Sequence, residues 1–237
     1  SNGSRTLTEV QQAGWVAPEG PLGRLSALAR ERAALAQGTR RTLERQLVGL
    51  DAAPSFIGAL SRPDVAVIAE LKRRSPSKGV LDAALNAASR ATVYARGGAA
   101  ALSILTEPSE FGGSLADLDA ARSSVAIPLL RKDFIVDEIQ LLEARVTGAS
   151  AVLLIARALP AGRFVELTHE ARSLGLDVLL EVRDERELER ALAVPEGVIG
   201  VNNRNLESLQ LDDAVSERLL RLIPGTRIAV YESGVRD

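Results

Sequence analysis

The sequence predicts an α/β protein with a parallel sheet, closed as a (βα)8 TIM barrel and preceded by a helical extension. Three observations lead to this prediction. Short apolar runs alternate with helical patterns over most of the chain, without a reversal of that order. Glycines lie between a helical pattern and the next apolar run, where helices are expected to stop. A length of 237 residues suits one barrel domain.

The expected strands are apolar runs that are too apolar to face water and too short to bury themselves. They are Val65–Leu71, Ala101–Leu105, Ile127–Arg131, Ala151–Ala156, Val178–Val182, Val198–Asn202 and Ile228–Glu232. The helical patterns between them are Ala83–Arg96, Leu115–Ser123, Ile135–Thr147, Ala161–Leu174, Glu185–Ala193 and Asp212–Leu222. Alternating helices and buried strands imply a parallel sheet, and seven such units favour a barrel over an open sheet.

The first 64 residues differ in character from the rest. Residues 1–20 have little apolar periodicity, so we expect a flexible or tag-derived extension, with a short helix through Thr8–Gln12. Residues 21–64 are expected to form helices, because leucines recur at helical spacing from Leu22 to Leu50, with a break at Gly38. This segment is too short for a core of its own and should pack on the barrel of residues 65–237.

Only seven strands are found by pattern, whereas a closed barrel of this class needs eight. The printed sequence stops soon after the seventh run, at Asp237, and the eighth βα unit is expected to be absent from this chain. An open barrel would expose a long sheet edge, which proteins in water avoid. A truncated, inactive barrel that acts as a binding or assembly-prone domain is therefore an alternative to an enzyme.

The amino-acid composition argues against several kinds of functional site and binding partner. The chain has no cysteine and one histidine, so thiol chemistry and a histidine-based metal cluster are not expected. The net charge is −2, which gives no reason to expect nucleic acid as a partner. No apolar run approaches the roughly 20 residues of a membrane span. We expect a cytoplasmic protein with no cofactor and a small-molecule partner, and its oligomeric state stays open, a monomer included.

The stretch Val65–Gly79 is the first candidate for chemistry. A strand there ends in Glu70 and Lys72, which are two residues apart and therefore point the same way, and a serine-rich loop follows. Only three of the 29 basic residues are lysines: Lys72, Lys78 and Lys132. Because arginine cannot release a proton near neutral pH, these lysines are candidates for proton transfer, against the simpler alternative of a strand-end ion pair.

Polar residues also follow the other expected strands, where parallel barrels carry their chemistry. They include Lys132, Glu181, Asn202, Arg204, Glu232, Ser233 and Gly234. Lysines and carboxylates form a general acid–base set that needs no metal. We expect Lys72 and Lys132 each to lower the pKa of the other, and the apolar surroundings of Glu181 to raise its pKa. Arg204 and the amides near Ser233 suit an anion such as phosphate. His169 is expected on the surface of a helix.

Seven stretches in the chain resemble, in order, those of the indole-3-glycerol phosphate synthase family. They are IAELKRRSPSKG (Ile68–Gly79), LTEPSEFGGSLADL (Leu105–Leu118), PLLRKDFIVDEIQLLEAR (Pro128–Arg145), GASAVLLIA (Gly148–Ala156), LLEV (Leu179–Val182), IGVNNRNL (Ile199–Leu206) and ESGV (Glu232–Val235). The resemblance implies a (βα)8 barrel that converts 1-(2-carboxyphenylamino)-1-deoxyribulose 5-phosphate to indole-3-glycerol phosphate, with loss of carbon dioxide and water, in tryptophan biosynthesis.

The same resemblance implies roles for individual residues. Lys132 resembles the general acid of ring closure, Glu181 its carboxylate partner in proton transfer, and Lys72 the lysine near the substrate carboxylate. Glu70, Asn202 and Glu232 resemble polar positioning groups. The implied substrate contacts are Ser75, Arg204, Ser233 and Gly234, with Phe111 and Phe134 as apolar walls for the anthranilate ring. A related sugar-phosphate isomerase is a further alternative, but such an enzyme relies on a cysteine, and this chain has none.

Overall fold

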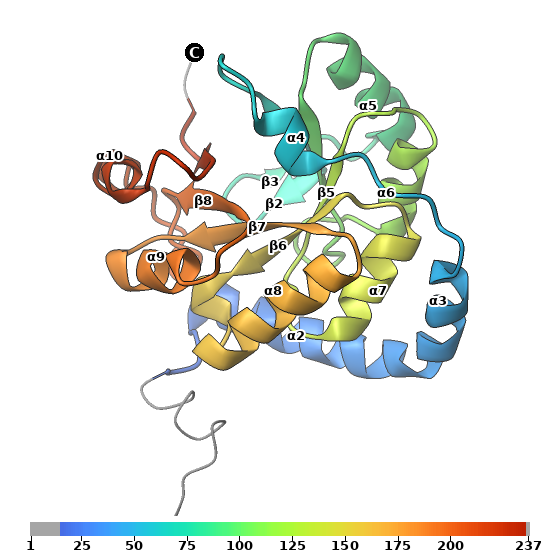
Figure 1. Ribbon diagram of the computed structural model, residues 1–237, viewed down its shortest axis with the longest axis horizontal. Coiled ribbons are helices and arrows are strands. Elements are labelled where there is room, and N and C mark those ends of the chain that lie inside the picture. Colours follow the sequence, from blue (N-terminus) through green and yellow to red (C-terminus); the bar gives the residue numbers. More distant parts are fainter. Residues whose placement is uncertain (1–14, 236–237) are drawn as a thin grey trace, which may run out of the picture.

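The computed structural model describes residues 15–235, so the helix expected at Thr8–Gln12 lies outside the described residues. A curled, parallel sheet of seven strands forms the centre of the protein, and helices cover its outer face (Figure 1). The strands, in spatial as well as chain order, are β1 (Ile68–Leu71), β4 (Ala101–Leu105), β5 (Leu129–Lys132), β6 (Ala151–Ile155), β7 (Asp177–Val182), β8 (Val198–Asn202) and β9 (Ala229–Glu232). The predicted α/β class with a parallel sheet is confirmed.

Each crossover between neighbouring strands contains a helix, as a parallel sheet requires. These helices are α5 (Ala87–Arg96), α6 (Leu115–Arg122), α7 (Glu138–Val146), α8 (Ala161–Ser173), α9 (Glu185–Leu192) and α10 (Ala214–Leu219), with 3₁₀ turns η2 (Ala156–Ala158) and η3 (Leu220–Leu222). Several begin at a side chain that caps their free N–H groups; Asp137 and Gln140, for example, form a capping box at the start of α7. These caps fix where each strand-to-helix loop ends.

The helical extension consists of α2 (Gly20–Ala36), the 3₁₀ turn η1 (Gln37–Thr39), α3 (Arg40–Leu47) and α4 (Phe56–Leu60). The break predicted at Gly38 falls within η1. Leu22, Leu25 and Phe56 are fully or nearly fully buried and belong to the same apolar core as the sheet. Helix α3 lies against α7 at the edge of the molecule (Figure 1). The extension is therefore held by the core of the barrel-like domain.

The expectation of a first strand from Val65, buried on both faces, is wrong at its start. Strand β1 begins at Ile68, and Val65 and Val67 are 89% and 57% exposed. The reason is that β1 lies at an edge of the sheet and pairs only with β4, so the residues before it have no second neighbour. The serine-rich loop also contains a small hairpin, β2 (Arg74–Ser75) and β3 (Gly79–Val80).

Alternation along the strands decides which side chains face the inside of the curled sheet. On β5, Leu130 and Lys132 face inward and line a cavity, whereas Arg131 points outward to α7. The same period of two brings Ile68 and Glu70 of β1 to the inside. Every strand of the sheet contributes inward-facing residues in this way, and their C-terminal ends share one rim.

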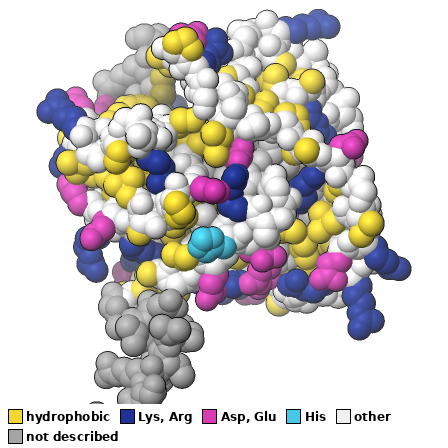
Figure 2. All heavy atoms as spheres, in the orientation of Figure 1, with side chains coloured by type: hydrophobic (Ala, Val, Ile, Leu, Met, Phe, Trp, Pro, Cys, Tyr) yellow, Lys and Arg dark blue, Asp and Glu magenta, His cyan; other side chains and the backbone are white. Residues whose placement is uncertain are grey.

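The surface shows no broad area of one charge on the face drawn in Figure 2, where basic and acidic side chains are intermixed. His169 is exposed on α8, as expected. No helix among residues 15–235 is both long and apolar enough to span a membrane.

Candidate active site

A cavity of about 1310 Å³ extends along the edge strands β1 and β9 to the C-terminal rim of the sheet. All twelve candidate residues line it: Glu70, Lys72, Ser75, Phe111, Lys132, Phe134, Glu181, Asn202, Arg204, Glu232, Ser233 and Gly234. They come from positions 70 to 234 of the chain and meet because the ends of parallel strands share one rim. The fold thus brings all twelve side chains to one cavity.

Two lysines share one carboxylate at the centre of the cavity. Lys72 Nζ donates to Glu70 Oε1 at 2.5 Å, and Lys132 Nζ donates to Glu70 Oε2 at 2.9 Å. Lys132 Nζ also lies 3.4 Å from Glu232 Oε2. The arrangement holds both ammonium groups within one hydrogen-bonded cluster around an acceptor carboxylate.

The expectation that Lys72 and Lys132 lower each other's pKa is wrong for Lys132. Burial alone would lower the pKa of Lys132, but the carboxylates of Glu70, Glu232 and Glu181 outweigh it and raise that pKa above its ordinary value. Burial would likewise raise the pKa of Glu70, and the ammonium groups of Lys132 and Lys72 instead lower it to about 2. Because Glu70 stands between the two lysines, attraction to the carboxylate dominates over repulsion between the cations.

Glu181 has the opposite character. It is 4% exposed, and burial together with the nearby Glu232 raises its pKa to about 8, as its apolar surroundings predicted. Its Oε1 accepts a hydrogen bond from Asn202 Nδ2 at 3.0 Å, which fixes the carboxyl group. At pH 7 this group therefore holds its proton in the folded protein and can donate it.

Glu232 is the third carboxyl group of the cluster, and Gly200 makes room for it. A Cβ atom at Gly200 would lie 2.1 Å from Glu232 Oε1, so any larger residue would displace the carboxyl group. Burial raises the pKa of Glu232. Its Oε1 is buried without a hydrogen-bond partner among the described residues. This oxygen is packed against the backbone of β8 at Gly200.

Aromatic side chains and the guanidinium of Arg204 lie on different sides of this cluster. Phe111, in the β4–α6 loop, and Phe134, in the β5–α7 loop, have ring centroids 6.3 Å apart and form an apolar wall. On the β8 and β9 side, Arg204 lines the cavity and donates from Nη1 to the Leu209 carbonyl. Ser233 and Gly234 follow β9 with left-handed φ angles of 64° and 79°. The cavity thus offers an apolar end, a charged centre and a cationic end.

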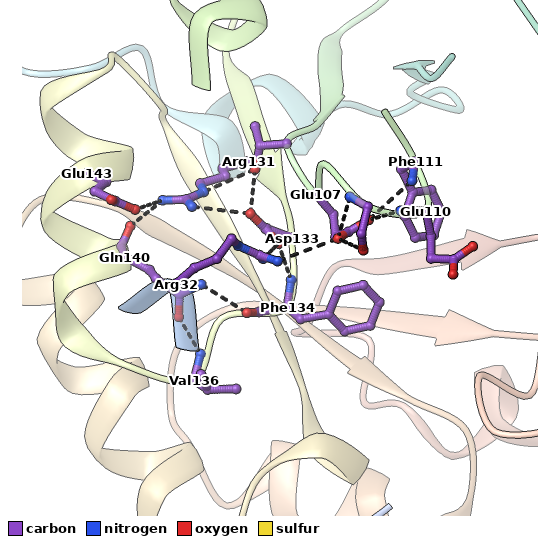
Figure 3. Close-up of polar contacts among 12 residues, drawn as sticks. Arg32, Glu107, Glu110, Phe111, Arg131, Asp133, Phe134, Val136, Gln140 and Glu143 are labelled. Carbon is purple, nitrogen blue, oxygen red and sulfur yellow. Dashed lines mark hydrogen bonds and ion pairs between the residues drawn. The ribbon is translucent and has the colours of Figure 1, made fainter. Parts of the chain in front are cut away.

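The sequence did not predict a partly buried network of charged side chains behind the apolar wall, drawn in Figure 3. Arg32 of helix α2 donates to Asp133, which follows Lys132, and lies within ion-pair distance of Glu107, which follows β4. Arg131 bonds to Asp133 and Glu143 in the same network. Arg32 gave no signal in the sequence, because it is one of many arginines on an amphipathic helix. Among residues 15–235, no group of three or more His, Asp or Glu side chains is arranged to hold a metal ion.

Comparison with known proteins identifies the family of this chain. Residues 26–237 match the family model described as indole-3-glycerol phosphate synthase. The chain belongs to the indole-3-glycerol phosphate synthase family. The match covers the curled sheet, the rim residues and most of helix α2, so family membership rests on the whole described domain and not on one motif.

Curated relatives carry the family name. The chain is 51% identical over 175 residues to the indole-3-glycerol phosphate synthase of Paenarthrobacter aurescens, an alignment that covers 74% of this chain and 64% of that protein. It is 52% identical to the one of Nocardioides sp., over 78% of this chain and 70% of that protein. For Opitutus terrae the identity is 46%, over 89% and 84%. The chain therefore spans only about two thirds of the length of the first two relatives.

Solved structures resemble the chain only distantly. A chain of the tryptophan synthase complex from Pyrococcus furiosus reaches a TM-score of 0.39 at 15% identity, over 70% of this chain and 86% of that chain. A likeness at that level supports no conclusion about the fold or the site.

Proposed function

We propose that the protein is an indole-3-glycerol phosphate synthase, which closes the indole ring of 1-(2-carboxyphenylamino)-1-deoxyribulose 5-phosphate. One carbon dioxide and one water leave as the product forms. The observation that carries this proposal is the central cluster, in which charged Lys132 stands among Glu70, Glu232 and neutral Glu181. Such a cluster supplies both a proton donor and a carboxylate acceptor without any added group.

In the first step, the aryl carbon that bears the carboxylate attacks the ribulose carbonyl carbon. The carbonyl oxygen becomes an alkoxide, which is a stronger base than an amine, so Lys132 donates a proton to it despite its raised pKa. Phe111 and Phe134 hold the aryl ring against the carbonyl, which limits the motion lost in the transition state. Loss of carbon dioxide then returns the electron pair to the ring and restores its aromaticity.

The second part of the reaction removes water. Glu181 is protonated at neutral pH and donates to the departing hydroxyl group, and its carboxylate then takes a proton from the adjacent ring carbon. Glu181 ends the cycle protonated, and Lys132 regains from solvent the one proton that the overall reaction consumes when the substrate carboxylate leaves as carbon dioxide. Asn202 orients the carboxyl group of Glu181. We place the phosphate at the cationic end, near Arg204, Ser233 and Gly234, and the substrate carboxylate near Lys72.

We also propose that the sheet closes as an eight-stranded barrel. The edge strands β1 and β9 each pair with one neighbour only, and Val67 and Tyr231 beside these edges are 57% and 39% exposed. A further strand between them would cover both edges. Slow hydrogen exchange of amides on the outer edges would indicate such a partner strand in the protein, and rapid exchange would contradict it.

The enzyme proposal is tested by replacing Lys132. Mixing the protein with the carboxyphenylamino substrate should generate the fluorescence of indole-3-glycerol phosphate. Lys132→Ala should lower kcat by about 10²- to 10⁴-fold, the range for loss of a general acid. Lys132→Arg keeps the positive charge among the three carboxylates but cannot release its proton, so it should remain folded and also lose activity.

Full activity of the folded Lys132→Arg protein would refute the assigned acid. Absence of turnover in the unaltered protein would refute the proposed function itself. The alternative of an inactive binding domain is not favoured, because the named relatives and the intact acid–base cluster both point to an enzyme. A melting temperature that does not change when indole-3-glycerol phosphate is added would favour the inactive domain again.

A further inference from the structure

Two buried carboxylates lie directly behind the aromatic wall, and neither belongs to the central acid–base cluster. Glu107 follows β4 and Asp133 follows β5, and their side chains are 0% and 1% exposed. A buried carboxylate is costly unless its oxygens are bonded and its charge is balanced. The bonds made by these two side chains therefore indicate what they hold in place.

Glu107 organises the loop that carries Phe111. Its Oε1 accepts from the Ser109 amide at 2.9 Å and from the Ser109 hydroxyl at 2.5 Å, and its Oε2 accepts from the Glu110 and Phe111 amides at 2.7 and 3.1 Å. Figure 3 shows the carboxylate inside the turn formed by this loop. The backbone direction at Phe111 is thus set by one buried side chain.

Asp133 does the same for Phe134. Its Oδ1 accepts from the Phe134 amide at 2.8 Å, and its Oδ2 accepts from the Thr106 hydroxyl at 2.8 Å and from Arg131 Nη2 at 3.2 Å. Both walls of the aryl-binding end therefore depend on these two carboxylates.

Arg32 is the group that reaches both. Its Nη2 donates to Asp133 Oδ1 at 2.8 Å, and its Nη1 lies 3.5 Å from Glu107 Oε1. Arg131 already serves Asp133 and Glu143, whereas Arg32 is the only cation paired with Glu107 among residues 15–235. The planar guanidinium places two donors in a fixed fork, which suits two carboxylates from neighbouring loops.

We propose that Arg32 is a positioning residue for the aryl end of the cavity. By holding Glu107 and Asp133 together, it ties helix α2 of the extension to the two loops that carry Phe111 and Phe134. Arg32 and Glu107 do not line the cavity, so Arg32 acts through the loops and does not touch the bound molecule. The identity of the aryl ligand rests on the proposed function, whereas the positioning of the loops rests on the contacts alone.

The first experiment needs no ligand. Arg32→Met removes the donors and keeps an apolar stem, and amide hydrogen exchange is measured at residues 109–111 and 134 of the full chain. We expect exchange at these amides to be about ten-fold faster. Arg30→Met is the matched control, because Arg30 lies on the same helix, is exposed and makes no hydrogen bond or ion pair in the described part of the chain. Arg30→Met should leave the same amides unchanged.

The second experiment compares two ligands. The reduced substrate analogue, in which the ribulose carbonyl is a hydroxyl, contains the aryl ring, and ribulose 5-phosphate lacks it. Arg32→Met should bind the aryl ligand about ten-fold more weakly and bind ribulose 5-phosphate as the unaltered protein does. Arg32→Lys, which keeps the charge without the fork, should lose about three-fold for the aryl ligand only.

Three results would overturn the proposal: unchanged exchange and unchanged aryl affinity in Arg32→Met, equal weakening for both ligands, or an Arg32→Lys protein that matches the unaltered one in both measurements. If Arg32→Met does not fold, Arg32→Lys alone decides between these outcomes. If the unaltered protein binds neither ligand, the proposed function fails, and the exchange experiment still decides the positioning role.

Discussion

Replacing Glu181 by glutamine tests the electrostatics of the site through the stability of the whole protein. Burial and Glu232 raise the pKa of Glu181 from 4.5 to about 8. Below pH 4.5 the folded and unfolded chains both hold the proton. Between 4.5 and about 8 the unfolded chain releases it while the folded chain keeps it, so the free energy of unfolding falls as the pH rises and levels off above about 8.

The size of this loss follows from the shift. At about 1.36 kcal/mol per unit, a rise from 4.5 to about 8 corresponds to about 5 kcal/mol. This figure is an upper limit for Glu181 alone, because Glu232 and Lys132 titrate in the same cluster. In Glu181→Gln the amide oxygen still accepts from Asn202, and no proton is released at any pH. The free energy of unfolding of the variant should exceed that of the unaltered protein by less than about 1 kcal/mol at pH 5 and by several kcal/mol at pH 8.5.

Urea denaturation at pH 5, 7 and 8.5 measures this difference. Glu189→Gln is the control, because Glu189 is an exposed glutamate on α9, and it should follow the unaltered protein at every pH. Parallel stability curves for Glu181→Gln and the unaltered protein would show that Glu181 is ionised at ordinary pH, and the assignment of its proton to dehydration would then be wrong.

Two further predictions concern groups around the site. Glu187 of α9 lies outside the cavity, and burial and Asp184 raise its pKa to about 7. Glu187→Gln should therefore be more stable than the unaltered protein by up to about 3 kcal/mol at pH 8 and equal to it at pH 4.5. Urea denaturation would contradict this prediction if the stability difference were the same at both pH values. Phe134→Ala removes one ring of the apolar wall and should raise KM for the aryl substrate by about ten-fold or more. The affinity for ribulose 5-phosphate, measured by calorimetry, should be unchanged. A fall in both affinities would mean that the ring supports the fold and not the aryl site.

The sequence determined which residues reach the site. Alternation along a strand decides whether a side chain faces inward, and the ends of parallel strands share one rim, so the position of Glu70, Lys132 or Glu181 within its strand was enough to place it at the cavity. The break near Gly38 and most helix ends also followed from local chemistry, because caps and glycines act within a few residues.

Only the tertiary structure decided how those residues act on one another. The position of Glu70 between Lys72 and Lys132 reverses the expected pKa shift of Lys132. The distance between Glu70 and Lys132 could not be predicted from the sequence, because it depends on the curl of the sheet. The same holds for Arg32, whose partners follow it by 75 and 101 positions. Local patterns set the direction of a side chain, whereas the energy of a charge depends on every neighbour that folding brings within a few ångströms.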